Sequence, residues 1–244
     1  SFYLNIKKNS NNVLKANKID IILSKKNKLK ENLIDRSMLN KDRIKSILNS
    51  IEEVISFKDP THKVIAKWRR PNGLIINRVT MPIGVLGVIY EARPNVTSDV
   101  AILSFKSGNS AILRGGKEAL QSNIFISNLF RSSLKKNKIN QDCIQLVNNT
   151  DRKIVDLMLS KMSNYIDIII PRGGKSLVKK VLDLSNVPTI GHLEGLCHVY
   201  LDSQYNYSTA ERLIINSKLR RTSICGAAET LLINKSVKKN DIYK

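Results

Sequence analysis

The sequence predicts an α/β fold in which helices cover both faces of a doubly wound parallel sheet. From Met81 onward, short apolar runs of strand length alternate with longer stretches of helical period. The short runs are continuously apolar, as expected for strands that are buried on both faces of a parallel sheet. Strand–helix alternation of this kind is typical of a doubly wound domain. The 244 residues have room for one large domain or two small ones with a sizeable core.

The first part of the chain is predicted to be helical and to lead into a hairpin. Apolar residues recur at three- and four-residue spacing from Ile44 to Ile55, and Asp59-Pro60 closes that helix. Two runs of strand type then flank Asn72-Gly73, a pair that accepts the positive φ angles of a tight turn. We therefore expect a hairpin over residues 64–80.

The remaining elements alternate along the chain and give the predicted sheet its order. The expected strands cover residues 85–90, 111–114, 144–147, 166–170, 199–201 and 230–233. The expected helices cover residues 97–107, 118–135, 151–163, 174–184 and 208–219.

The composition is that of a globular protein, with a strong positive charge that needs an explanation. The formal net charge is +21, while only 5% of residues are aromatic. Lys, Ile and Asn are enriched together, which favours solvated lysines from an A+T-biased coding sequence over a nucleic-acid footprint. A non-catalytic module that binds nucleotides or nucleic acid stays as an alternative. The apolar runs are too short to span a membrane.

The cysteines, histidines and N-terminus indicate a reducing compartment and no metal. The three cysteines, Cys143, Cys197 and Cys225, cannot all pair and form no CxxC motif, so we expect a cytoplasmic protein. The histidines lack metal-ligand spacing, so we expect no metal. The chain begins at Ser1 without a Met and without the order of a signal peptide, which suggests processing or a fragment.

Three strand-to-helix turns carry residues that suit an anionic ligand. The turns contain Glu91–Asn95, then Arg114-Gly115-Gly116-Lys117, and later Arg172-Gly173-Gly174-Lys175. Paired glycines let a backbone approach a ligand, and a helix that follows offers free N–H groups to phosphate. Neither glycine turn matches a standard nucleotide fingerprint, and an ordinary capped turn is the other interpretation. A dinucleotide or a phosphorylated substrate is the resulting hypothesis.

Cys225 is the candidate nucleophile. It lies between a predicted helix and a predicted strand, shortly after Arg220 and Arg221. Nearby cations favour the thiolate form that attacks carbonyl carbons, although simple burial would also explain a cysteine here. Cys143 and Cys197 adjoin apolar strands and are interpreted as small buried apolar residues.

Six blocks of sequence cover residues 82–97, 106–109, 113–118, 170–174, 191–200 and the segment around Cys225. In this order they resemble γ-glutamyl phosphate reductases of the aldehyde dehydrogenase superfamily. The resemblance implies NADPH-dependent reduction of L-glutamyl 5-phosphate to L-glutamate 5-semialdehyde in proline biosynthesis, with phosphate released and a cysteine thioester as intermediate. A different acyl-phosphate or aldehyde reductase on the same scaffold is a more distant alternative.

By this resemblance, Cys225 attacks the acyl phosphate and Asn95 stabilises the oxyanion. Hydrolytic aldehyde dehydrogenases carry a glutamate base at the position that matches His192, and Glu194 lies two residues on. Which of the two occupies the position of the base stays open. A missing carboxylate base would make thioester hydrolysis slow, which suits a reductase.

The resemblance also assigns binding residues. Arg114, Gly116 and Lys117 fall at the adenosine ribose, where a cation in place of a carboxylate favours NADPH over NADH. Arg172, Gly173 and Gly174 line the pyrophosphate or the nicotinamide. Arg220 and Arg221 hold the substrate carboxylate or phosphate, unless they only complement a helix dipole.

The implied organisation is a NADP-binding domain over residues 1–191 and the beginning of a catalytic domain over 192–244. The N-terminal helices belong to the first domain, and the hairpin 64–80 serves as its oligomerisation arm. The family's chain extends beyond both ends of this one, so the chain looks truncated and should have little activity alone. The resemblance implies a homo-oligomer at full length and leaves coupling to glutamate 5-kinase possible.

Overall fold

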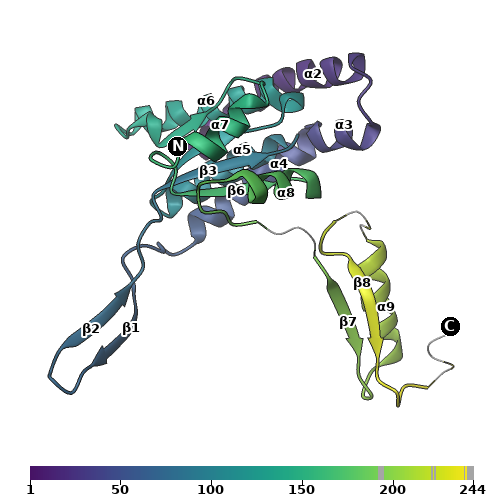
Figure 1. Cartoon of the computed structure of the whole chain (residues 1–244). Helices are drawn as coiled ribbons and strands as arrows, with labels where there is room; N and C mark the ends of the chain where they lie inside the picture. The colour runs from purple at the N-terminus through teal and green to yellow at the C-terminus, as the bar shows by residue number, and fades with distance from the viewer. Residues whose placement is uncertain (192–194, 221, 223, 239, 241–244) are drawn as a thin grey trace. The chain divides into compact units, whose positions relative to one another are not determined.

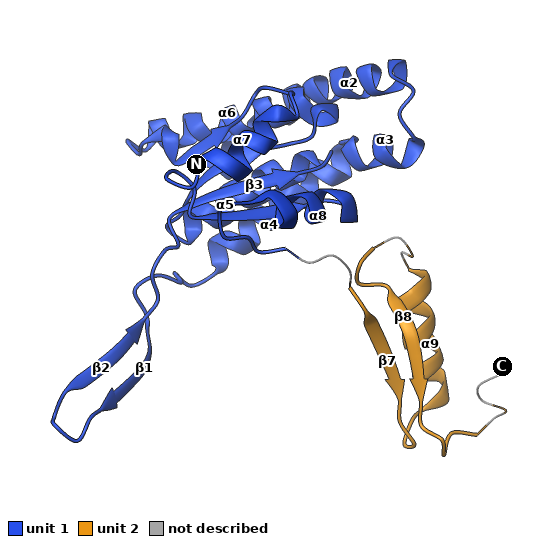
Figure 2. Ribbon diagram, in the orientation of Figure 1, with its two compact units in different colours: residues 1–191 blue, residues 192–244 orange. Residues whose placement is uncertain are grey.

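The computed structural model consists of two compact units, residues 1–191 and residues 192–244 (Figure 2). It describes residues 1–191, 195–220, 222, 224–238 and 240. Within these residues, no helix combines the length and the apolar character that crossing a membrane requires.

Unit 1 is built on a four-stranded parallel sheet with the order β5-β4-β3-β6 (Figure 1). The central strand β3 pairs in parallel with both β4 and β6, so the chain crosses over between strands. The predicted doubly wound fold is confirmed. The strands are β3 (Val85–Tyr90), β4 (Ser110–Arg114), β5 (Ile144–Leu146) and β6 (Ile168–Arg172).

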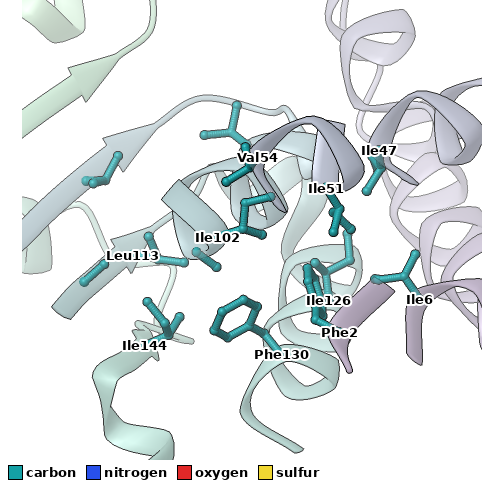
Figure 3. Packing of buried hydrophobic residues seen from close by; sticks show 14 of the residues in the cluster. Phe2, Ile6, Ile47, Ile51, Val54, Ile102, Leu113, Ile126, Phe130 and Ile144 are labelled. Atoms are coloured by element: carbon teal, nitrogen blue, oxygen red, sulfur yellow. The ribbon is translucent and has the colours of Figure 1, made fainter. Parts of the chain in front are cut away.

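Helices pack on both faces of this sheet. One core cluster joins β3, β4 and β5 to helices α1, α4, α5 and α6, and it includes Phe2, Ile102 and Phe130 (Figure 3). The other joins Ile89 and Ile169 to helices α7 and α8. The helices are α1 (Phe2–Lys8), α2 (Ser10–Lys26), α3 (Glu31–Ser37), α4 (Lys41–Ser56), α5 (Pro94–Lys106), α6 (Leu120–Lys136), α7 (Lys153–Lys161) and α8 (Lys175–Leu184), with short 3₁₀ turns η1 (Lys117–Ala119) and η2 (Gln141–Cys143).

The predicted helix with the apolar stripe is α4. Its first turn is capped by Asn40, whose side chain accepts a hydrogen bond from the N–H of Arg43. The stripe buries Ile44, Ile47 and Ile51 against the core. Amphipathic spacing thus fixes which side of the helix faces α5 and α1.

Two boundaries differ from the sequence prediction in ways that matter for the site. Helix α5 begins at Pro94, three residues earlier than predicted, because proline is favoured at the first helical position. Strand β6 continues through Pro171 to Arg172, which pairs with Tyr90. Asn95 therefore lies in the first turn of α5, and Arg172 ends a strand.

The hairpin pairs β1 (Val64–Arg69) with β2 (Ile75–Val79) in an antiparallel two-stranded sheet. Gly73 has a φ of +86°, as the predicted tight turn requires. Almost every residue of the two strands is exposed, and Trp68, Ile65 and Ile75 are among the exposed apolar side chains. A two-stranded ribbon with this surface gains little stability from burial of its own.

Asp20 joins helix α2 to helix α6. This residue of α2 is only 3% exposed. Its carboxylate accepts hydrogen bonds from the N–H groups of Gln121 and Ser122, at 3.0 and 2.8 Å, and from the Ser122 hydroxyl at 2.7 Å. Desolvation raises the pKa of Asp20, while these bonds oppose that effect. Asp20 thus caps helix α6 from a distant part of the chain.

Replacing Asp20 by alanine should lower the free energy of unfolding by about 2–3 kcal/mol, because buried N–H groups would lose their acceptor. Urea unfolding followed by circular dichroism measures this change. The matched control is Asp183→Ala, an exposed aspartate of α8, which should stay within about 0.5 kcal/mol. Equal effects of the two substitutions would contradict the capping role.

Unit 2 is one strand–helix–strand element. Strands β7 (Cys197–Leu201) and β8 (Ala228–Ile233) pair in parallel, and α9 (Tyr207–Leu219) connects them. Many apolar side chains of this unit are exposed, among them Leu196, Leu213 and Leu219 at 74%, 59% and 64%. The described residues of unit 2 therefore bury little apolar surface by themselves.

Candidate functional site

An open groove of about 470 Å³ lies in unit 1 where β3 and β4 end. Ligands of doubly wound sheets bind at this carboxyl edge. The sequence-predicted residues Arg114, Gly116 and Lys117 line the groove. Its other lining residues are Leu33, Ile89, Tyr90, Glu91, Ala92, Glu118, Thr150, Arg152, Val155, Ser176, Leu177 and Lys180.

The two glycine turns meet at Glu91. A β-carbon on Gly116 would lie 3.0 Å from the Ala92 nitrogen and 3.3 Å from the Glu91 carbonyl carbon. One on Gly173 would lie 2.7 Å from the carboxyl carbon of Glu91. Both turns thus need glycine for close packing against the segment after β3. The structure brings together the turns that the sequence singled out.

The helix N-termini that follow these turns already hold carboxylates. Asp20 accepts from the first N–H groups of α6. Glu91 accepts from the Gly174 N–H, just before α8, at 2.9 Å. The sequence predicts free N–H groups here, but acidic side chains from other elements reach both helix ends and accept from them. A phosphate at α8 must compete with Glu91.

The cations of the groove differ in how freely they can meet a ligand. The Arg114 guanidinium donates to the carbonyl groups of Gly115 and Thr150, at 3.2 and 3.1 Å, and desolvation lowers its pKa. Arg114 therefore holds the segment after β5 in place. Lys117 is exposed, which leaves its ammonium accessible to a ligand.

The groove is also lined by four charged residues that were not predicted to bind a ligand: Glu91, Glu118, Arg152 and Lys180. Lys180 also forms an ion pair with Asp156 at 2.6 Å. Glu118 follows Lys117 directly, which was the available signal for that residue. Arg152 and Lys180 come from the segments after β5 and β6, and only the strand order brings those segments to the groove.

Asn95 is exposed in the first turn of α5, and its side-chain amide donates to Asp99 at 3.0 Å. Desolvation raises the pKa of Asp99, and the bond from Asn95 opposes that rise. The bond uses one of the two amide hydrogens of Asn95. An exposed amide that is oriented in this way can donate to a negatively charged oxygen.

Cys225 is exposed in the turn between α9 and β8 in unit 2. The Cys197 thiol donates to the Cys225 carbonyl at 3.3 Å, and a β-carbon on Gly195 would lie 2.5 Å from that oxygen. Cys197 and Cys143 are half-buried, so neither is the fully buried residue that the sequence suggested. The backbone at Cys225 is thus packed closely while its side chain faces solvent.

The other predicted residues of unit 2 are less informative. Arg220 is exposed and caps α9. Arg221, His192 and Glu194 lie outside the described residues. Over the part of the chain that the structure describes, no group of three or more His, Cys, Asp or Glu side chains could hold a metal ion.

Comparisons with known proteins find relatives of this chain that are named γ-glutamyl phosphate reductase. The chain is 44% identical to γ-glutamyl phosphate reductase of Bartonella quintana over 236 residues, which cover 97% of the chain and 57% of the relative. For the Mesorhizobium japonicum enzyme, the identity is 45% over 92% of the chain and 53% of the relative. This chain is a homologue of the γ-glutamyl phosphate reductases. It spans little more than half the length of these relatives.

Solved structures agree with this relationship. The γ-glutamyl phosphate reductase of Thermotoga maritima is 40% identical with a TM-score of 0.88, and the match covers 96% of the chain and 56% of that structure. An NADP complex of glyceraldehyde-3-phosphate dehydrogenase from Methanocaldococcus jannaschii is 16% identical, with a TM-score of 0.61 over 99% of the chain and 50% of that structure. At this identity it shows the fold alone. No family model matches the chain.

Proposed function

We propose that this chain forms the cofactor-binding unit and the nucleophile segment of an NADPH-dependent γ-glutamyl phosphate reductase. The enzyme would reduce L-glutamyl 5-phosphate to L-glutamate 5-semialdehyde and release phosphate, in the cytoplasmic synthesis of proline. The observation that carries the proposal is the homology across 92–97% of the chain to reductases of this name. The cation-lined groove and the exposed Cys225 support it.

In this proposal Cys225 forms the covalent intermediate. Its thiolate attacks the acyl carbon, the bond from that carbon to the phosphate oxygen breaks, and a γ-glutamyl thioester remains. Reduction then gives a tetrahedral adduct, whose collapse releases the aldehyde and restores the thiolate. The Asn95 amide and the Cys225 N–H would hold the negative oxygen at both stages. Arg220 and Arg221 would bind the carboxylate of the substrate or its phosphate.

The positively charged side chains of the groove suit the negatively charged phosphates of a nicotinamide dinucleotide. Arg114, Lys117 and Arg152 line it, and the glycine turns let the backbone come close to a ligand. The bound cofactor would supply the hydride that reduces the thioester. Lys117 and Arg114 would bind the adenosine end, while Arg172, Gly173 and Gly174 would line the pyrophosphate or nicotinamide end.

Replacing Lys117 by glutamate should shift the coenzyme preference toward NADH by about tenfold or more, because a carboxylate repels the 2′-phosphate. Fluorescence titrations with NADPH and with NADH give the ratio of the two dissociation constants. Lys179→Glu is the control, since Lys179 is exposed on α8 and does not line the groove. An unchanged ratio in Lys117→Glu would contradict the assignment of this residue.

The assembly of the enzyme belongs to the same proposal. The exposed apolar residues of the hairpin would be covered in a homo-oligomer, which makes the hairpin an oligomerisation arm. The exposed apolar residues of unit 2 would be covered by further parts of the catalytic domain, so the chain alone should have little activity. A docked glutamate kinase would transfer the labile acyl phosphate directly to the reductase.

A titration separates this function from a nucleic-acid-binding module. We expect the chain to bind NADPH, as measured by nicotinamide fluorescence. We expect it to bind an unrelated DNA duplex only weakly at physiological salt. Tight DNA binding that falls steeply with salt, without NADPH binding, would favour the module and contradict the reductase.

A further inference from the structure

The carboxylate of Glu91 occupies the N-terminus of α8. Its Oε1 accepts a hydrogen bond from the Gly174 N–H at 2.9 Å, and the Glu91 N–H donates to the Arg172 carbonyl at 3.1 Å. Glu91 is therefore attached to the second glycine turn by its backbone and by its side chain. The partial positive charge of the helix end stabilises a negative group at this position.

The paired glycines make room for this side chain. A β-carbon on Gly173 would lie 2.7 and 2.8 Å from the carboxyl and γ carbons of Glu91, and one on Gly174 would lie 3.4 Å from Oε1. Any larger residue at position 173 would push Glu91 away from the turn. The Gly-Gly pair thus serves an internal carboxylate as directly as it would serve a phosphate.

Glu91 also lines the groove that contains Lys117, Arg114 and Arg152. Like the phosphate groups of a ligand that would suit this groove, the Glu91 carboxylate is a negatively charged oxygen acceptor. It offers the α8 N-terminus an acceptor of the same charge and hydrogen-bonding type as a phosphate oxygen. A phosphate oxygen and the Glu91 carboxylate cannot both accept the Gly174 N–H in one geometry.

We propose that Glu91 is an internal substitute for the cofactor pyrophosphate: it caps α8 in the free protein and is displaced when the dinucleotide binds. This inference rests on the proposed function, because it concerns the same groove. Glu91 is a positioning residue. Its backbone holds the second glycine turn, whereas its carboxylate competes with the dinucleotide for the end of α8. Removing its charge should therefore have opposite effects on the free protein and on the complex.

The Glu91→Gln variant tests this prediction, because the glutamine oxygen can still accept the Gly174 N–H and the fold is kept. Without ligand, the melting temperature should fall by about 1–4 °C, since an uncharged cap interacts less with the helix end. NADPH should bind about two- to fivefold more tightly, because it no longer displaces a charged competitor. If Glu91 had a purely structural role, the substitution would lower the melting temperature and would also weaken NADPH binding.

A second ligand and a control variant locate the effect. Adenosine 2′-monophosphate, measured by competition with NADPH, lacks the pyrophosphate and should bind Glu91→Gln and the unaltered protein equally. Glu53→Gln, an exposed glutamate of α4 that does not line the groove, should change neither melting nor NADPH binding.

The possible results distinguish the displacement of Glu91 from the proposed function. Tighter NADPH binding with unchanged 2′-monophosphate binding supports displacement of Glu91. Unchanged or weaker NADPH binding by Glu91→Gln, or equal tightening of both ligands, overturns the inference and leaves the proposed function standing. Absence of NADPH binding by the unaltered protein overturns the proposed function and the role of Glu91 with it.

Discussion

Replacing Cys225 by serine in the complete enzyme should reduce the formation of glutamate 5-semialdehyde by at least about a thousandfold. A serine hydroxyl ionises far less readily than a cysteine thiol, so serine is the much weaker nucleophile at this exposed turn. NADPH oxidation in the presence of glutamyl 5-phosphate measures the rate. Binding of NADPH should be unchanged, because Cys225 is not one of the residues that line the groove.

The other cysteines provide the controls for this experiment. Cys143 lies before β5 in unit 1, so Cys143→Ser should keep nearly full activity. Cys197→Ser should cost little, because a hydroxyl can still donate to the Cys225 carbonyl. If Cys225→Ser kept normal activity while Cys197→Ser lost it, the nucleophile would be misassigned.

Replacing Asn95 by alanine should lower kcat by about a hundred- to a thousandfold, the usual cost of removing one oxyanion donor. In the proposed mechanism the amide would bind charge that develops only as the carbonyl is attacked, so KM should change little. Asp99 holds the Asn95 amide through a 3.0 Å hydrogen bond, which gives the donor a fixed direction. Steady-state kinetics with glutamyl 5-phosphate as the varied substrate separate kcat from KM.

Asn128→Ala is the matched control for this substitution, since Asn128 is an exposed asparagine in the middle of helix α6. It should leave both constants unchanged. A loss of Asn95→Ala activity that appears in KM alone would show that Asn95 binds substrate without stabilising the oxyanion.

The sheet and most of its turns could be predicted because they leave local signals. Buried parallel strands are continuous apolar runs, and Asn72-Gly73 marks a turn by its φ preference. The turns at Arg114 and Arg172 lie at one edge of the sheet, as expected for residues that end parallel strands. Proline at the first helical position explains why α5 begins earlier than its apolar period suggested.

The carboxylates that cap helices from a distance could not be predicted. Asp20 lies about a hundred residues before the N–H groups that it accepts from, and a single buried acid adds nothing to a helical period. Glu91 reaches Gly174 only because β3 and β6 are neighbours. In the same way, the contact between Cys197 and Cys225 depends on the parallel pairing of β7 with β8.

The proposed thioester on Cys225 is tested most directly by the mass of the protein after exposure to L-glutamyl 5-phosphate without NADPH. We expect an added mass of one glutamyl group on the peptide that contains Cys225. This adduct should be absent from Cys225→Ser and should be discharged when NADPH is added. An enzyme that turns over substrate without forming an adduct, or that carries the adduct on another residue, would rule out Cys225 as the nucleophile.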